Sequence, residues 1–173
     1  MEVKNIENIN ERNERLEKWI KMIKNENTRN YIEFRIIPQI EYYSKSSRNN
    51  KKKYLRCKTV IIVFAGLIPI ATLFSEYGVL AKVIIAALST TVSVITAYLE
   101  LRNYHVLWMS YRTKREQLLT VLMYYFTGTG IFSTITDAKQ QDNLLIESCE
   151  QYLSEEHQWW KEMSIELSNK EKQ

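Results

Sequence analysis

Two long apolar runs stand close together in the middle of the chain. Residues 59–75 and residues 83–99 each form a stretch of 17 consecutive uncharged residues. At about 1.5 Å per residue, a helix of that length covers roughly 25 Å, close to the hydrocarbon thickness of about 30 Å. The link between them, residues 76–82, is short and contains Gly78. This pattern predicts two transmembrane helices joined by a tight turn, with both ends of the hairpin on the same side of the membrane.

Buried helices of a soluble bundle are the alternative interpretation of each run. A single run of this length is compatible with either, because the core helices of large proteins are also apolar on all sides. Two adjacent runs in a chain of 173 residues favour the membrane, since so short a chain has little mass with which to cover two such helices.

Beyond the second run, the apolar positions take the spacing of a helix with one buried face. Residues 79–127 contain neither glycine nor proline, which predicts one continuous helix of up to about 70 Å that leaves the membrane. The TGTG segment around Gly128 and Gly130 is the expected stop. A 3,4 alternation defines the predicted packing and oligomer stripe of this helix: Leu101, Tyr104, Trp108, Tyr111, Arg115, Leu118, Leu122 and Tyr125.

Two further amphipathic segments are candidates to cover that stripe. One lies near the C-terminus, on a helix that Asp137 is expected to cap: Leu145, Cys149, Tyr152, Trp159 or Trp160, Met163 and Leu167. The other lies near the N-terminus, with Asn13 on its seam: Ile9, Leu16, Ile20 and Ile23. Pro38 marks the expected start of another helix, which leads through a basic segment into the membrane.

These patterns predict an all-α membrane protein, a two-transmembrane helical hairpin whose helices extend into a cytoplasmic antiparallel helical bundle. Four segments are expected. Residues 1–30 form an N-terminal amphipathic helix and residues 31–58 a basic cytoplasmic helix. Residues 59–99 form the hairpin, with its outer turn at 76–82, and residues 100–173 form the rest of the bundle.

The bulk composition hides this organisation. With 45% apolar and 25% charged residues and a mean hydropathy of −0.33, the chain matches an average soluble protein. The net charge, however, is +7 in residues 1–58, 0 in residues 59–99 and −3 in residues 100–173. By the positive-inside rule both termini are cytoplasmic, and the first span is expected to act as its own insertion signal. Basic residues flank that span on the cytoplasmic side: Lys51, Lys52, Lys53, Arg56 and Lys58.

Groups that support catalysis or cofactor binding do not converge in the sequence. Cys57 and Cys149 form no disulfide framework, and His105 and His157 have no carboxylate or cysteine at metal-ligand spacing. The four glycines fit no phosphate-binding loop. Three glutamates near the C-terminal tryptophans fit a solvated helix face better than an acid/base pair: Glu155, Glu156 and Glu162. We expect no catalytic residue, cofactor or metal, and the basic run suits anionic headgroups better than nucleic acid.

A polar stripe on the second span carries the candidate function. Ser89, Ser93, Thr96 and Glu100 are spaced four, three and four residues apart and so share one face of a helix. If several copies turned this face toward a common axis, hydroxyls would line a pore and a ring of Glu100 carboxylates would favour cations. Ordinary helix packing is the alternative, because small residues let helices approach closely in lipid. The two interpretations are compatible with each other.

The chain resembles the SLATT domains, bacterial two-transmembrane effectors associated with nucleotide-signalling conflict systems. The resemblance rests on residues 38–54 (PQIEYYSKSSRNNKKKY), the short-looped hairpin, residues 101–119 (LRNYHVLWMSYRTKREQLL) and residues 154–160 (SEEHQWW). These are architectural patterns rather than a catalytic signature.

The resemblance implies an effector of the bacterial inner membrane that oligomerises and depolarises the bilayer when a separate sensor or nucleotidyltransferase partner is triggered. On this interpretation, lipid and further copies of the chain are its direct partners. A passive membrane anchor, whose cytoplasmic bundle recruits another protein, is the alternative function. A membrane-bound enzyme is disfavoured, since no set of convergent groups supports it.

Overall fold

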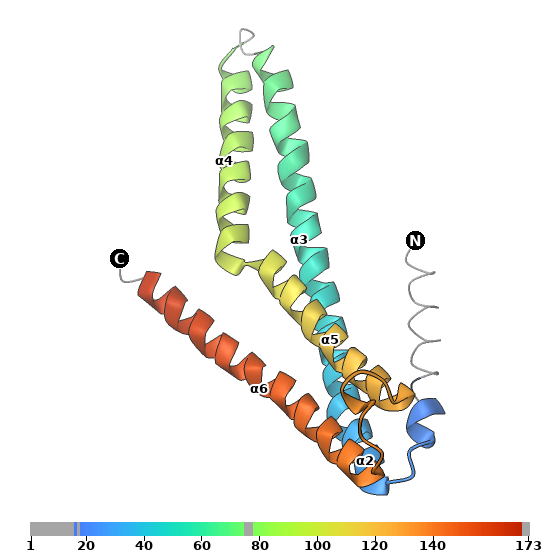
Figure 1. The fold of residues 1–173 in the computed structure, drawn as a ribbon. Helices are drawn as coiled ribbons and strands as arrows, with labels where there is room; N and C mark the ends of the chain where they lie inside the picture. The colour runs from blue at the N-terminus through green and yellow to red at the C-terminus, as the bar shows by residue number, and fades with distance from the viewer. Residues whose placement is uncertain (1–15, 17, 75–77, 171–173) are drawn as a thin grey trace. The chain divides into compact units, whose positions relative to one another are not determined.

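Helices and the turns that connect them account for every residue that the computed structural model describes (Figure 1). The description covers residues 16, 18–74 and 78–170, without side chains beyond residue 154. Its elements are α2 (Glu26–Tyr31), the π-helical turn η1 (Ile32–Ile36), α3 (Ile37–Thr72), α4 (Val79–Arg102), α5 (Tyr104–Thr127), the short 3-10 helix η3 (Gly130–Phe132) and α6 (Ala138–Lys170). The expected seam residues Ile9 and Asn13 lie outside the described residues.

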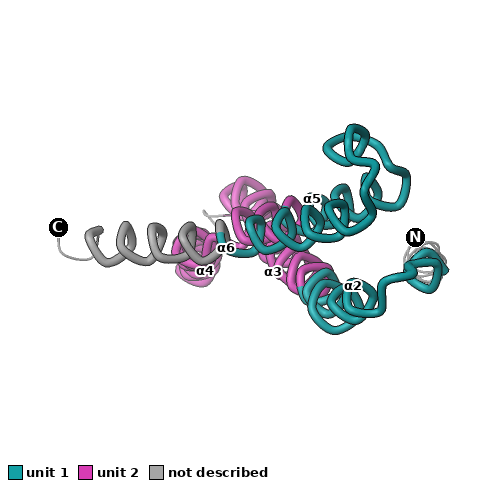
Figure 2. The backbone as a smooth tube through the Cα atoms, turned by 60° about the horizontal axis from the view of Figure 1, so that its bottom comes forward, with its two compact units in different colours: residues 1–42, 114–173 teal, residues 43–113 magenta. Residues whose placement is uncertain are grey.

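The chain divides into two compact units (Figure 2). Unit 1 combines Met1–Tyr42 with Lys114–Gln173, and unit 2 is the continuous segment Tyr43–Thr113. Both α3 and α5 therefore contribute residues to each unit. The membrane hairpin lies entirely in unit 2.

Unit 2 contains two helical stretches long and apolar enough to cross a membrane. They belong to the helical segments Glu26–Thr72 and Val79–Phe132, and no residue of either apolar window is buried inside the chain. A stripe of buried or half-buried positions runs along each helix, at alternating spacings of three and four residues. On α3 the stripe comprises Tyr54, Cys57, Ile61, Phe64, Ile68 and Ala71. On α4 it comprises Ala81, Ile85, Leu88, Val92, Ile95 and Leu99, and Ser89, Thr91 and Thr96 beside it are also half-buried. Because α3 and α4 lie side by side in the hairpin (Figure 1), these stripes form its seam.

The prediction of one continuous helix through residues 79–127 is wrong, because the helix is interrupted at Asn103. This residue adopts the left-handed conformation (φ 47°, ψ 35°) between α4 and α5. Glycine is not required there, since asparagine visits this region more readily than other residues with a side chain. The break also changes the predicted stripe: Leu101 is 75% exposed, whereas Tyr104 is 8% exposed.

Pro38 does not interrupt the chain where a new helix was expected to begin. It lies in the first turn of α3, and the preceding turn η1 is π-helical, with the Ile37 N–H donating to the Ile32 carbonyl. The π-helical turn directly before Pro38 changes the backbone hydrogen-bonding pattern and lets the helix continue past the missing proline N–H. The chain therefore stays helical from Glu26 through Thr72.

The predicted stop after α5 is confirmed. The helix ends at Thr127, and Gly128 and Gly130 take positive φ values of 63° and 58°. At Gly130 a Cβ would lie 2.9 Å from Cδ2 of Tyr124, which is too close for a side chain. Asp137 caps α6 as expected, because its Oδ1 accepts a hydrogen bond from the Lys139 N–H at 3.2 Å.

Unit 1 has its own apolar core, drawn from both ends of the chain. Its buried apolar side chains include Leu16, Ile20, Ile23, Ile32, Ile36, Ile40, Leu118, Leu122, Phe132, Leu145, Cys149 and Leu153. Both short amphipathic segments expected from the sequence contribute to this core as far as it is described. Tyr152 of the C-terminal stripe is half-buried, and the side chains expected on that stripe from residue 159 onward lie outside the described residues.

Candidate functional site

Three faces of α4 differ in what they carry. The apolar seam forms the first. The second carries the polar stripe, centred about a quarter turn from the seam at about 100° per residue. Large exposed apolar side chains occupy the third face, among them Leu80 (80% exposed), Val83 (58%) and Val94 (62%). A helix with a seam, a lipid-facing surface and a separate polar flank can contact a further copy, or water, through that flank.

The polar stripe of α4 lies beside the seam, and its residues differ in exposure. Ser89 and Thr96 are half-buried, while Ser93 is exposed. Glu100 is exposed as well, three residues ahead of the break. Within one hairpin the flank is therefore partly exposed: Ser93 and Glu100 lie at the surface, and Ser89 and Thr96 lie at the edge of the seam.

The hydroxyl groups of this stripe donate within their own helix. Ser89 Oγ donates to the Ile85 carbonyl at 2.9 Å, Ser93 Oγ to the Ser89 carbonyl at 3.1 Å, and Thr96 Oγ1 to the Val92 carbonyl at 2.8 Å. Each proton is thereby satisfied without water, which lets the stripe stay in hydrocarbon. What each hydroxyl still offers outward is an acceptor oxygen. Such a surface suits cations or water rather than anions.

The basic residues before the first span lie against aromatic rings. Lys51 Nζ is 5.2 Å from the ring centre of Trp108, Lys53 Nζ is 5.7 Å from that of Tyr104, and Lys58 Nζ is 5.9 Å from that of Tyr54. All five basic side chains predicted to flank the membrane, Lys51, Lys52, Lys53, Arg56 and Lys58, are exposed. Ammonium groups over aromatic faces are the arrangement expected where a helix leaves the bilayer for the headgroup layer.

The predicted stripe of α5 is divided between the two units. In unit 2 it lies against α3: the Tyr111 ring stacks on Tyr43 with centroids 6.1 Å apart, and Ser47 Oγ donates to the Trp108 carbonyl at 3.3 Å. In unit 1, Leu118 and Leu122 are buried, with 1% and 0% exposure, and Tyr125 is half-buried. Arg115 is half-buried, and its guanidinium pairs with the adjacent Glu116.

Two polar clusters in unit 1 were missed by sequence reasoning. In the first, Asp142 on α6 accepts hydrogen bonds from Asn25 Nδ2 at 2.6 Å and from the Tyr125 hydroxyl at 2.5 Å. In the second, Glu150 accepts from the Tyr31 hydroxyl at 2.9 Å and pairs with the Arg35 guanidinium, whose Nε lies 3.1 Å from Oε1. No local spacing signals these pairs, because most of their members stand more than a hundred positions apart in the sequence.

Burial and hydrogen bonding shift the pKa values of four groups in or beside these clusters, namely Tyr31, Tyr125, Cys149 and Glu150. Burial and the Asp142 carboxylate raise the pKa of Tyr125, and burial and Glu150 raise that of Tyr31. Burial raises the pKa of the Cys149 thiol to about 12, which removes the thiolate a nucleophile would need. The Arg35 guanidinium lowers the pKa of Glu150. Within the described part of the chain there is also no cluster of three metal-binding side chains.

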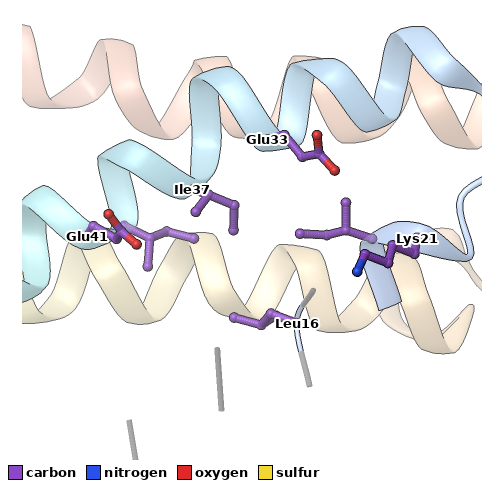
Figure 3. Close-up of a pocket in the computed structure, with 7 residues that line it drawn as sticks. Leu16, Lys21, Glu33, Ile37 and Glu41 are labelled. Carbon is purple, nitrogen blue, oxygen red and sulfur yellow. The ribbon is translucent and has the colours of Figure 1, made fainter. Parts of the chain in front are cut away.

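A groove of about 340 Å³ opens on unit 1 beside the N-terminal end of α3 (Figure 3). Ile37 lies between the carboxylates of Glu33 and Glu41 on one side of it, Leu16 lies on the opposite side, and Lys21 lies at one end. Both acidic side chains and the lysine are exposed. An apolar lining with charged edges suits a peptide segment better than a small reactive substrate.

Comparison with known proteins gives one informative result. Neither a curated protein nor a solved structure matches the chain significantly. Residues 31–160, which include both apolar helices, match the family model described as SMODS and SLOG-associating 2TM effector domain 1, SLATT_1. The match covers most of the chain and agrees with its all-α, two-transmembrane architecture. The chain therefore belongs to the SLATT_1 family of two-transmembrane effector domains.

Proposed function

We propose that the chain is the pore-forming effector of a bacterial antiviral system, acting in the inner membrane as a homo-oligomer. The observation that carries this proposal is the open polar flank of α4. Serine and threonine oxygens and the Glu100 carboxylate lie there on one surface, beside an apolar seam and opposite a lipid-facing side. Several hairpins whose flanks meet around one axis would enclose a polar path through the bilayer.

The proposed pore selects by charge and by hydrogen-bonding capacity. Hydroxyl protons are already used within the helix, so the oxygens that remain can only accept. A ring of Glu100 carboxylates at the mouth adds negative charge. Cations are therefore the expected permeant species, and their flux dissipates the membrane potential.

The orientation belongs to the same proposal. Exposed lysines resting on Trp108, Tyr104 and Tyr54 suit the cytoplasmic headgroup layer, where anionic lipids attract basic side chains. Both termini are then cytoplasmic, and unit 1 faces the cytoplasm. A partner that senses infection or makes a nucleotide signal would act there, in keeping with the family's association with SMODS and SLOG domains. No catalytic step by this chain is needed, and nucleic acid is not an expected partner.

Ion flux through proteoliposomes tests the pore. The full chain should pass cations, and its expression in bacterial cells should collapse the membrane potential. Combining Glu100→Gln with Ser93→Leu should abolish the flux while the protein still inserts. Val94→Leu, on the lipid-facing side of α4, is the matched control and should leave the flux intact. Unchanged flux in the double variant would overturn the assignment of the lining.

A membrane anchor that recruits another protein is the second candidate function. The groove on unit 1, with its apolar lining and charged edges, favours it. On this alternative the chain passes no ions under any condition, while a stable partner copurifies with it. Ile37→Asp would place a charge in the apolar lining of the groove and should release that partner without changing membrane insertion.

A further inference from the structure

Asn103 stands at the junction between the second membrane helix and α5. It is the one residue other than glycine with a positive φ among the described residues. Its neighbours on both sides remain helical, because its N–H donates to the Leu99 carbonyl at 3.1 Å and its own carbonyl accepts from the Leu107 N–H at 3.0 Å. No glycine or proline lies within residues 79–127. The sequence could therefore also adopt an unbroken helix here, and the interruption depends on the backbone conformation of Asn103 alone.

The buried positions on either side of the break are out of phase. Along α4 the seam repeats at spacings of three and four as far as Leu99, and on an unbroken helix it would continue at Asn103 and Val106. The structure instead buries Tyr104 (8% exposed) and leaves Val106 46% exposed. The left-handed residue thus advances the pattern by one position, which corresponds to about 100° of rotation around the helix.

An unbroken helix would align a different face of α4 with α5. At about 100° per residue, the buried Tyr104 lies roughly 140° around an unbroken helix from the centre of the apolar seam, but only about 50° from the centre of the polar stripe. The members of that stripe are Glu100, Thr96, Ser93 and Ser89. While one face of α5 stays packed on α3, the conformation of Asn103 therefore determines whether the apolar or the polar face of α4 is turned toward α3.

The α5 side of this junction is held in place. Trp108 accepts a hydrogen bond from Ser47 and lies beneath Lys51, and the Tyr111 ring stacks on Tyr43. All of these contacts are with α3 and lie within unit 2. A change of backbone conformation at Asn103 that keeps these α5 contacts in place would turn α4 relative to α3.

One hydrogen bond exists only when the helix is broken. The hydroxyls of Tyr98 and Tyr104 lie 3.0 Å apart across Asn103. Residues six apart point to well-separated sides of an unbroken helix, at about 100° per residue, so these hydroxyls cannot meet there. The tyrosine pair is a latch for the left-handed conformation.

We propose that Asn103 is a rotational switch that presents or hides the polar stripe of α4. With Asn103 left-handed, the apolar seam faces α3 and the polar stripe lies open on the flank. When Asn103 becomes α-helical, α4 and α5 form one helix, α4 turns by about 100°, and the stripe turns toward α3. Naming the first state open and the second closed rests on the proposed pore function, whereas the rotation itself does not.

Disulfide cross-linking within the hairpin measures the rotation without reference to ion flux. Counted outward from the turn, native Cys57 is the fifth seam position of α3 and Ile95 is the fifth of α4. With Asn103 left-handed, Ile95→Cys should therefore form a disulfide with Cys57 on oxidation in membranes. In the unbroken helix, Thr96 rather than Ile95 would face Cys57, so Thr96→Cys should form the disulfide with Cys57 instead. The chain without an engineered cysteine is the control for background oxidation, because Cys149 is buried.

Substitutions at the hinge should move the ratio of the two cross-links. Asn103→Ala disfavours the left-handed conformation and should shift the ratio about tenfold toward Thr96→Cys, while Asn103→Gly should shift it toward Ile95→Cys. Tyr98→Phe, which removes the latch but keeps the ring, should act in the same direction as Asn103→Ala. Asn103→Asp keeps the tolerance for positive φ and should behave as the native chain does, which guards against a general folding defect.

The outcomes separate the switch from the pore. Equal ratios in all four hinge variants would overturn the switch, even if the chain conducts ions. A shifted ratio without flux in any variant would support the rotation and contradict the pore. If the chain both rotates at Asn103 and conducts ions, the Asn103→Gly variant should conduct more ions than the native chain and the Asn103→Ala variant fewer. Leakage that changed in the opposite sense would overturn the assignment of the open state.

Discussion

The hydroxyl of Tyr125 on α5 and the carboxylate of Asp142 on α6 meet in a hydrogen bond of 2.5 Å. Asp142 is only 7% exposed, and its other oxygen accepts from Asn25 at 2.6 Å. Three segments of unit 1, the turn before α2, the end of α5 and the start of α6, therefore converge on one carboxylate. A buried carboxylate is tolerated only while such donors remain in place.

Removing the phenol should destabilise unit 1. Tyr125→Phe keeps the ring, which contacts Phe132 with centroids 5.6 Å apart, but leaves one oxygen of Asp142 without its donor. We expect a loss of about 1–3 kcal/mol in the free energy of unfolding. Urea unfolding in detergent, followed by circular dichroism, measures it. Glu147→Gln, on the exposed face of α6, is the control. Equal stabilities of the two variants would contradict a structural role for the cluster.

Stability should depend on pH through Glu150. Its pKa is lowered from 4.5 in the folded chain, chiefly by the Arg35 hydrogen bond. A folded-state pKa below the unfolded value means that the contribution is present above about pH 4.5 and is lost as the pH falls through the folded pKa. The pair is partly exposed, so the effect is small. Glu150→Gln should flatten the pH dependence of the free energy of unfolding below about pH 4.5. A slope identical to that of the native chain would refute it.

The two cysteines should differ in reactivity. Cys149 is fully buried, and its pKa is raised to about 12, so almost no thiolate forms near neutral pH. Maleimide labelling of the folded Cys57→Ser variant in detergent at neutral pH should therefore be slow, and should become rapid after unfolding. The native chain, whose Cys57 is only half-buried, provides the comparison. Rapid labelling of Cys149 in the folded protein would show that the core of unit 1 opens locally.

Two glycine substitutions should have opposite effects. At Gly130 the positive φ and the nearby Tyr124 ring both oppose a Cβ, so Gly130→Ala should cost about 1–3 kcal/mol of stability. Gly66 lies inside α3 with no atom within 4 Å of a Cβ, so Gly66→Ala should be neutral or slightly stabilising. Thermal unfolding of the two variants in the same detergent compares them. A similar melting temperature for both would contradict the role assigned to the turn at Gly130.

Several features of the structure follow from local sequence alone. The apolar runs predict the two membrane helices, since spanning a bilayer demands uncharged length and little else. Gly128 and Gly130 stop α5, and Asp137 caps α6, because backbone conformation and capping depend on neighbours in the chain. Pro38 misled the prediction, since a π-helical turn accommodates it without ending the helix.

The helix break is an instructive failure of the sequence pattern. Residues 79–127 offer no conventional helix breaker, and the polar stripe ending at Glu100 runs on in phase to Tyr104. Two buried faces that are out of phase, the seam ending at Leu99 and the face beginning at Tyr104, are joined by the left-handed Asn103. This difference in phase is visible only once the burial of both helices is known. The local pattern therefore predicted one stripe where the structure has two.

The sequence by itself determined that this chain is helical, that two of its helices suit a membrane and that a polar stripe follows one of them. These are consequences of hydropathy and periodicity, which act between residues close together in the chain. Only the tertiary structure shows that Asp142 accepts hydrogen bonds from Asn25 and Tyr125, that Glu150 contacts Tyr31 and Arg35, and that a left-handed Asn103 separates α4 from α5. Such contacts are chosen by packing between distant segments, where burial, hydrogen bonding and helix phase must be satisfied together.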